Sequence, residues 1–168
     1  MAATRKKGPA VTPLPNYITP AGFKRLSDEA VRLRMTDRQK VVREVADAAA
    51  QGDRSENAEY IYGKKKLREI DRRLEWLGKR LDAAVVVDPK EKRGAKAFFG
   101  AKVVVEDEEG SEKEYQLVGV DEIEVAAGRI SWRSPMGTAL LGRTEGDEVR
   151  VKTPVGVRVL TVMEVRYE

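Results

Sequence analysis

Residues 67–84 read LREIDRRLEWLGKRLDAA, and this stretch decides the fold. Its apolar residues recur at alternating steps of three and four, a spacing typical of a helix that packs along one seam against another helix. The seam consists of Leu67, Ile70, Leu74, Leu77, Leu81 and Ala84. We expect a long helix that begins near Ser55 and ends near Ala84, and its seam requires a second helix as partner.

The partner helix lies directly upstream. Thr19-Pro20 is a helix-start signal, with Thr19 as the N-cap and Pro20 at the first helical position, and Gly52 ends the run. The apolar stripe is interrupted at Asp37, where the steps between Leu33 and Val45 become a run of fours, as in a coiled-coil stutter. The stripe consists of Phe23, Leu26, Ala30, Leu33, Val41, Val45 and Ala48. Two helices of roughly 30 residues joined by a very short turn predict an antiparallel hairpin on the order of 45 Å long.

The remainder of the chain has a different character. Asp88-Pro89 ends the helical part, and a polar linker leads to short β-rich runs separated by turn residues. The runs cover residues 98–105, 115–120, 129–133, 149–152 and 157–165, with a hairpin turn at 153–156 and a short helix at 135–141. We therefore expect an α+β protein. It should have a flexible tail over residues 1–16, a coiled-coil hairpin over 17–88, and a small antiparallel sheet with one short helix over 97–168 (the C-terminal domain).

The composition excludes several kinds of active site. The 168 residues include no cysteine and no histidine, which rules out zinc sites of the usual kind, thiol nucleophiles, histidine general bases and disulfides. Any metal chemistry must use oxygen ligands, which favours magnesium or manganese. The net charge of +4, from 32 basic and 28 acidic residues, permits contact with nucleic acid without establishing it. No apolar run approaches the roughly 18 residues of a membrane span, so we expect a cytoplasmic protein.

The turn between the two expected helices is acidic. It reads GDRSENAEY over residues 52–60, with Asp53 and Glu56 three positions apart. One interpretation is structural, because Asp-x-x-Glu before a helix forms a capping box in which Asp53 bonds the N3 amide and Glu56 reaches back. The other is functional, with both carboxylates pointing off the end of the rod. The two interpretations are compatible, since a capping role can hold a carboxylate in place.

A basic strip follows the turn. It consists of Lys64, Lys65, Lys66, Arg68, Arg72 and Arg73, and only Glu69 and Asp71 oppose these six cations locally. A solvated face with local pairs such as Lys65–Glu69 is one interpretation. A surface that contacts RNA phosphates is the other, because incomplete neutralisation leaves cationic charge available.

The tip and the strip together resemble a known family. GDRSENAEY at 52–60, followed by KKKLREIDRR at 64–73, is similar to the hairpin-tip signature of the Gre transcript-cleavage factors, and the basic stretch favours the GreB type. The resemblance continues, in the family's order, through FFGA at 98–101, VGVDEI at 118–123, SPM at 134–136, ALL at 139–141 and GDEV at 146–149. It implies an FKBP-like C-terminal domain that docks on bacterial RNA polymerase. The implied docking residues are Arg133, Ser134, Pro135 and Met136.

The resemblance also implies a function. The hairpin of such a factor enters the secondary channel of the polymerase and stimulates the polymerase's own cleavage of backtracked RNA, so we expect a monomeric, cofactor-like protein and not an enzyme. Asp53 is then expected to help hold a second Mg²⁺ of the polymerase active site, and Glu56 that ion or its water. Ser55, Asn57, Glu59 and Tyr60 would support them. The basic strip would hold the 3′ end of the nascent RNA, and contact with nucleic acid would occur within the elongation complex.

Two alternatives keep this fold. The first is a hairpin that occupies the polymerase channel without stimulating cleavage, which an altered tip would indicate. The second is a peptidyl-prolyl isomerase or chaperone, suggested by the FKBP-like topology alone, although a fold does not carry an activity. Such isomerases line a pocket with aromatic side chains, and the aromatic residues of the C-terminal domain are Phe98, Phe99, Tyr115, Trp132 and Tyr167.

Overall fold

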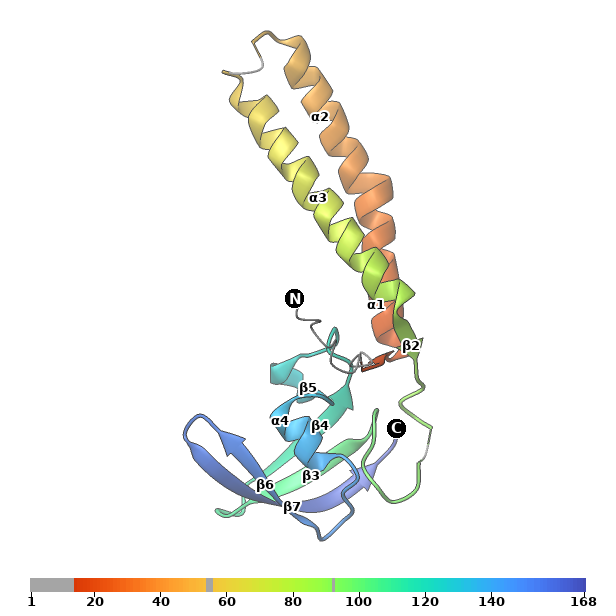
Figure 1. The fold of residues 1–168 in the computed structure, drawn as a ribbon, viewed down its shortest axis with the longest axis vertical. Coiled ribbons are helices and arrows are strands. Elements are labelled where there is room, and N and C mark those ends of the chain that lie inside the picture. Colours follow the sequence, from red (N-terminus) through yellow and green to blue (C-terminus); the bar gives the residue numbers. More distant parts are fainter. Residues whose placement is uncertain (1–13, 54–55, 92) are drawn as a thin grey trace, which may run out of the picture.

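The computed structural model describes residues 14–53, 56–91 and 93–168. It is an elongated molecule in which a helical hairpin projects from a domain built on a β-sheet (Figure 1). The α+β class expected from the sequence is confirmed. The tail expected over residues 1–16 is wrong at its end, because Asn16 already belongs to a strand; residues 1–13 lie outside the described residues. Within the described ranges, no helix has the length and apolar character needed to cross a membrane.

The first arm of the hairpin is an almost continuous helix. It consists of α1 (Pro20–Arg32), a π-helical turn η1 (Leu33–Asp37) and α2 (Arg38–Ala50). The Thr19 hydroxyl caps α1 by accepting a hydrogen bond from the Gly22 amide at 3.1 Å, as the sequence predicts. The π turn lies at the predicted stutter, where the Arg38 amide bonds to the Leu33 carbonyl. The wider turn absorbs the irregular spacing, so Val41 stays buried.

The second arm is α3 (Ala58–Asp82), which begins three residues later than Ser55, the start expected from the sequence. Ile70 and Leu77 of the predicted seam are buried, and the two arms pack along it. Gly63 lies in the same seam nearer the turn. A Cβ atom at Gly63 would lie 2.6 Å from Val45 Cγ2, so the missing side chain allows the arms to approach closely there.

A two-stranded parallel pair forms the base of the hairpin. Strand β1 (Asn16–Ile18) pairs with β2 (Ala84–Val86), which directly follows α3. Ile18 is buried with Leu26 and Leu77, so β1 closes the lower end of the helical seam. This pair is not predictable from the sequence, because three-residue strands are too short to show a period.

The C-terminal domain is a five-stranded sheet with the order β5-β4-β3-β7-β6. The strands are β3 (Lys102–Asp107), β4 (Glu112–Val118), β5 (Arg129–Ser131), β6 (Glu148–Thr153) and β7 (Gly156–Arg166), and the helices are the short η2 (Val125–Ala127) and α4 (Pro135–Leu140). Three of its four strand pairings are antiparallel, as expected from the sequence, but β4 and β5 pair in parallel. The segment that contains η2 brings the chain back to the end of the sheet at which β4 begins, so β5 runs in the same direction as β4. A tight hairpin would make the two strands antiparallel.

One face of this sheet carries the core of the domain. Buried valines and leucines from β3, β4, β6 and β7 pack together, and Leu140 of α4 is fully buried among them. The first β-rich run was expected from Phe98, but the strand begins at Lys102, because the Ala101 amide bonds to the Phe98 carbonyl in a turn.

Candidate functional site

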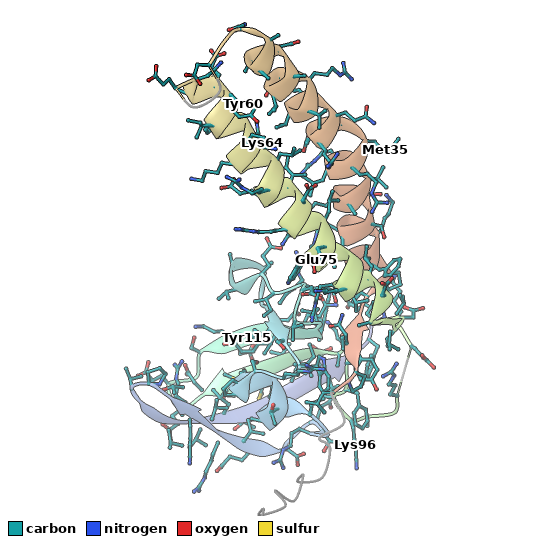
Figure 2. The ribbon with its side chains drawn as sticks, turned by 45° about the horizontal axis from the view of Figure 1, so that its top comes forward. Met35, Tyr60, Lys64, Glu75, Lys96 and Tyr115 are labelled. Atoms are coloured by element: carbon teal, nitrogen blue, oxygen red, sulfur yellow. The ribbon has the colours of Figure 1, made fainter. Side chains whose placement is uncertain are left out.

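The acidic turn lies at the end of the hairpin farthest from the C-terminal domain, as the positions of Tyr60 and Lys64 in Figure 2 show. Asp53 and Glu56 are both exposed there. Glu59 is exposed in the first turn of α3, and Tyr60 is half-buried. Ser55, predicted as a supporting residue, lies outside the described residues.

Asn57 organises the turn. Its side-chain oxygen accepts a hydrogen bond from the Tyr60 amide at 3.1 Å, which caps α3, and its side-chain nitrogen donates to the Ala48 carbonyl at 2.8 Å. One side chain therefore starts the second arm and holds it to the end of the first. The capping box considered for Asp53 and Glu56 is not the cap of α3, since its N-cap is Asn57 and both acids precede it.

The oxygen donors of the tip suit a hard cation but provide only part of a coordination shell. Carboxylates are the protein ligands that Mg²⁺ prefers. Among the residues that the structure describes, no group of three or more histidine, cysteine, aspartate or glutamate side chains is placed to hold a metal ion. Asp53 and Glu56 together could supply only part of the coordination shell of such an ion.

The predicted basic strip divides into two parts. Lys64, Lys65, Arg68 and Arg72 are exposed and Lys66 is half-buried, and none of the five forms an ion pair within residues 14–53, 56–91 and 93–168. The Lys65–Glu69 pair considered from the sequence is thus not formed. These five residues, the basic strip without Arg73, lie on α3 just beyond the acidic turn.

Arg73, the sixth predicted cation, differs from these five because it is paired within the chain, and this pairing competes with its predicted RNA-binding role. It forms an ion pair with Glu29 on the opposite arm and lies over the Trp76 ring, 4.4 Å from the ring centroid. The hydrogen bond from Arg73 holds the pKa of Glu29 below its usual value, and the same bond raises the pKa of Arg73. Asp71, which sequence reasoning set against the strip, is paired with Arg38 instead.

The predicted docking residues surround the start of α4. The Ser134 hydroxyl caps this helix by accepting from the Gly137 amide at 3.0 Å, and it donates to the Ser131 carbonyl at 2.7 Å. Pro135 is exposed, as a docking residue should be. Met136, in contrast, is half-buried and packs against the core, so part of its side chain has a structural role that the sequence did not indicate.

Arg133 is engaged within the chain. Its guanidinium donates to the carbonyl oxygens of Leu14 and Pro15, both at 2.6 Å, and lies over the Trp132 ring. These contacts hold the segment that leads into β1 beside α4. The docking role predicted for Arg133 therefore competes with an observed structural role.

Three of the five aromatic residues of the C-terminal domain gather around one hollow. Phe98, Phe99 and Trp132 line it together with Tyr17 of β1. The Tyr17 ring packs against Phe99 and Trp132, with centroids 5.8 and 5.4 Å away. Tyr167 lies elsewhere, bonded through its hydroxyl to the Lys96 carbonyl. An isomerase-like pocket receives no support, because β1 itself packs against these rings.

Sequence reasoning missed one polar cluster entirely. Asp121 and Glu122 of the run 118–123 contact residues at the base of the hairpin. Nothing in the spacing of that run indicates a partner about a hundred positions away.

Comparison with known proteins places these features in a family. The family model "Transcription elongation factor, N-terminal" matches residues 16–86, which contain the hairpin. The model "Transcription elongation factor, GreA/GreB, C-term" matches residues 91–167, which contain the sheet domain. The chain belongs to the GreA/GreB family of transcription elongation factors.

Individual Gre factors are similar over nearly the whole chain. The factor GreB of Haemophilus influenzae is 52% identical over 153 residues, covering 91% of this chain and 97% of that protein. GreB of Pasteurella multocida is 50% identical with the same coverage, and GreA of Syntrophobacter fumaroxidans is 44% identical over 150 residues. Among solved structures, the GreA factor homologue Gfh1 of Thermus thermophilus is 27% identical, covers 90% of this chain and 99% of its own, and has a TM-score of 0.41. The resemblance to Gre factors of the GreB type is confirmed.

Proposed function

We propose that this Gre factor binds bacterial RNA polymerase, places its hairpin in the secondary channel and stimulates the polymerase's own cleavage of backtracked RNA. It acts as a monomer in the cytoplasm, and it is not an enzyme by itself. Cleavage would remove the extruded 3′ end of the RNA and return the polymerase to elongation.

The observation that carries this proposal is that different residues of the hairpin turn hold its structure and present its carboxylates. Asn57 caps α3 and bonds the two arms together, while Asp53 and Glu56 are exposed at the far end of the rod. A two-helix rod with a narrow seam buries little apolar area for its length. Its main property is that it holds the tip far from the C-terminal domain. Acidic groups at its end can then enter a site that the C-terminal domain does not enter.

The roles of the tip residues follow from their chemistry. Asp53 would donate a carboxylate oxygen to a Mg²⁺ ion held mainly by the polymerase, and Glu56 would contact the same ion or orient a water molecule. A second ion of this kind, when bound, stabilises the attacking and leaving oxygens of a phosphodiester. Asn57 would limit the motion of both carboxylates by fixing the turn between the arms.

The basic strip would act on the RNA. Five cations without an ion-pair partner among the described residues follow directly after the acidic turn. Cationic side chains in such a row attract a phosphate backbone and release counterions on binding. The strip would therefore hold the extruded 3′ segment beside the tip.

A cleavage assay on purified backtracked elongation complexes tests the proposal. We expect the wild-type chain to release short 3′-terminal RNA fragments. Asp53→Asn and Glu56→Gln should each reduce the saturating cleavage rate by about a hundredfold or more, because a lost metal contact removes several kcal/mol of transition-state stabilisation. Polymerase binding should stay near that of the wild type. Asp47→Asn, which changes an exposed acid on α2, is the matched control.

Two results would contradict the proposal. Cleavage that survives both tip substitutions would show that these carboxylates take no part in the chemistry. Binding of the wild-type chain without release of fragments would favour the alternative, a regulator that occupies the channel and does not stimulate cleavage.

A further inference from the structure

The hairpin and the C-terminal domain are joined by a buried carboxylate. Glu122 follows β4 in the C-terminal domain and is only 5% exposed. Its carboxylate accepts hydrogen bonds from the Thr19 amide at 3.0 Å, from the Thr19 hydroxyl and from the Gly119 amide at 3.1 Å. Thr19 is the N-cap of α1, so the bonds connect the start of the hairpin to a loop 103 positions away.

Two glycines leave the space that this carboxylate occupies. A Cβ atom at Gly22, in the first turn of α1, would overlap the Glu122 carboxyl group. A Cβ atom at Gly119 would overlap the Tyr17 carbonyl of β1. The two domains therefore meet at a distance that only glycine permits on either side.

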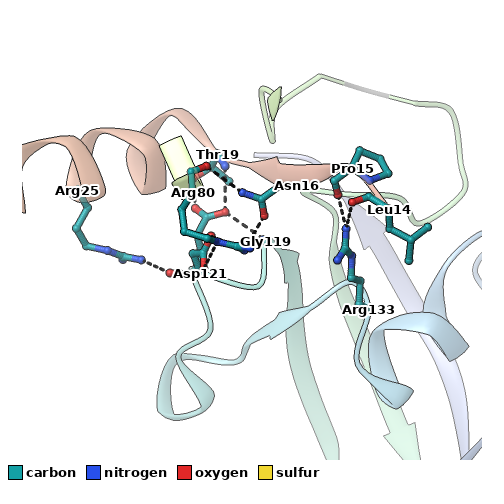
Figure 3. A network of polar contacts seen from close by, with 10 residues as sticks. Leu14, Pro15, Asn16, Thr19, Arg25, Arg80, Gly119, Asp121 and Arg133 are labelled. Carbon is teal, nitrogen blue, oxygen red and sulfur yellow. Dashed lines mark hydrogen bonds and ion pairs between the residues drawn. The ribbon is translucent and has the colours of Figure 1, made fainter. Parts of the chain in front are cut away.

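A second set of contacts ties the other arm to the same loop. Arg80 of α3 forms an ion pair with Asp121, with Nη2 2.8 Å from Oδ2, and the Asp121 side chain is 8% exposed. Arg80 also donates to the Asn16 side chain at 2.8 Å, and Arg25 of α1 donates to the Asp121 carbonyl at 2.9 Å. Figure 3 shows these groups converging on one loop. Both arms and β1 are thus attached to residues 119–122.

We propose that Glu122 is a positioning residue that sets the direction of the hairpin relative to the C-terminal domain. The inference rests on the proposed function, in which the C-terminal domain docks and the tip acts. Glu122 touches no reacting group; it acts through Thr19 and the rigid arms, and so determines where Asp53 and Glu56 arrive.

The length of the rod makes this direction critical. At about 1.5 Å per residue, the 25 residues of α3 span about 37 Å, so a tilt of about 10° at the base moves the tip by about 6 Å. Catalytic groups lose most of their effect when displaced by about 1 Å. A joint that allowed a tilt of about 10° would therefore displace the tip by several times the distance that catalysis tolerates.

Glu122→Ala and Glu122→Gln in the full-length protein separate positioning from simple packing. Alanine removes the bonds that the Glu122 side chain makes to Thr19 across the joint and leaves the contacts of Asp121 in place. Glutamine has the same shape, and its carbonyl oxygen can still accept from the amides of Thr19 and Gly119 while its NH₂ group donates to the Thr19 hydroxyl. We expect alanine to release the joint and glutamine to preserve most of it. Gly22→Ala should resemble Glu122→Ala, because it displaces the carboxylate without removing a polar group and adds a better helix former.

The matched control is Asp147→Ala. Asp147 accepts from the Thr144 amide at 2.9 Å and from the Thr144 hydroxyl at 3.2 Å, which is similar chemistry within one loop of the C-terminal domain. The Asp147→Ala substitution removes local hydrogen bonds, and none of these bonds connects the two domains. We expect it to leave both readouts described below unchanged.

The first readout is the distance between the two domains, and it does not depend on polymerase. The chain has no cysteine, so spin labels can be attached at Lys40→Cys on α2 and Lys152→Cys on β6, both exposed. Double electron–electron resonance should give a narrow distance distribution for the wild type, Glu122→Gln and Asp147→Ala. Glu122→Ala and Gly22→Ala should give a broad or shifted distribution. An unchanged distribution in both would overturn the proposal.

The second readout is the cleavage rate as a function of factor concentration. Glu122→Ala should lower the saturating rate by about tenfold or more, because a misplaced tip loses effective concentration, while the half-saturating concentration changes by less than about threefold. Glu122→Gln should restore the rate. A broad distance distribution with a wild-type rate would also overturn the proposal. Failure of the wild type to stimulate cleavage would instead refute the proposed function, and the distance measurement would still test the joint.

Discussion

Arg73 of α3 and Glu29 of α1 form a two-point ion pair across the hairpin, with Nε 2.7 Å from Oε1 and Nη2 3.0 Å from Oε2. The bidentate geometry matches the fork of the guanidinium to the carboxylate. The pair lies on the stem, between the acidic tip and the base of the hairpin. It joins the two arms in a region where Leu74 is only half-buried.

The Glu29–Arg73 pair should make hairpin stability depend on pH. The pKa of Glu29 is lower in the folded chain than its ordinary value of 4.5. As the pH falls below 4.5, the unfolded chain therefore takes up the proton first, and the stabilisation disappears as the pH passes through the lower, folded-state value. Glu29→Gln should lower the free energy of unfolding at neutral pH by up to about 1 kcal/mol, since the pair is partly exposed. The difference from the wild type should vanish in acid.

Urea denaturation at neutral and at strongly acidic pH measures this difference. Asp28→Asn is the control, because Asp28 pairs with Lys24 on the same helix and joins no arms. Equal destabilisation by Glu29→Gln at both pH values would show that the charge of Glu29 is not what matters.

Asn57 should affect both the stability of the hairpin and cleavage. Asn57→Ala removes the cap of α3, which costs about 1 kcal/mol, and also the bond to the Ala48 carbonyl. Asn57→Asp keeps an acceptor for the Tyr60 amide but has no donor for Ala48. We expect circular dichroism to show lower thermal stability for Asn57→Ala than for Asn57→Asp, while both lower the cleavage rate. Full cleavage by Asn57→Asp would mean that the contact between the arms is dispensable.

The basic strip should act through extruded RNA. Replacing Lys64, Lys65 and Lys66 by alanine should impair cleavage of deeply backtracked complexes more than of shallow ones, because only a long extruded segment reaches the strip. The loss should shrink as salt rises, since phosphate contacts are coupled to counterion release. The control replaces Lys24, Lys40 and Lys79, which are exposed elsewhere on the hairpin. A loss that is equal on both complexes and insensitive to salt would count against an RNA contact.

Pro135 offers a test of the docking surface that preserves the fold. It occupies the first turn of α4, where an acidic residue is electrostatically favourable, so Pro135→Glu should fold normally. A charge placed in the contact should raise the half-saturating concentration for cleavage by about tenfold, through the cost of desolvation, and leave the saturating rate intact. Val155→Glu, at the exposed β6–β7 turn, is the control. Unchanged half-saturation would place docking elsewhere on the domain.

The parts of the fold that were predictable from the sequence are those with a local period. The seam around Ile70 and Leu77 predicted the hairpin, and Thr19-Pro20 predicted the start of α1. The parts that were missed depend on pairings between distant residues. The β1–β2 pair joins Asn16 to Ala84, and the parallel pairing of β4 and β5 depends on the path of the chain through η2. Neither leaves a repeat in the sequence.

The candidate site shows the same limit at the level of single residues. Residue types and spacing identified the acidic tip, because acids at a turn between two long helices are conspicuous. Spacing could not show that Asn57 and not Asp53 caps α3, since both are good N-cap residues and the choice depends on where the arms meet. It also could not separate Arg73 from the strip, because the partner of Arg73 lies on the other arm.

The π turn at 33–37 has a consequence for how the length of the rod can vary among related proteins. Leu33 and Val41 are eight positions apart, one more than a heptad. If one residue were removed from the π turn, the spacing from Leu33 through Val41, Val45 and Ala48 would be that of an uninterrupted heptad repeat. The turn is therefore a single-residue insertion that the helix has accommodated without rotating its apolar face. A homologue that lacks the insertion would keep the same seam and shorten that arm by only about 1.5 Å. A single-residue difference in length at this place is thus compatible with the same packing of the two arms.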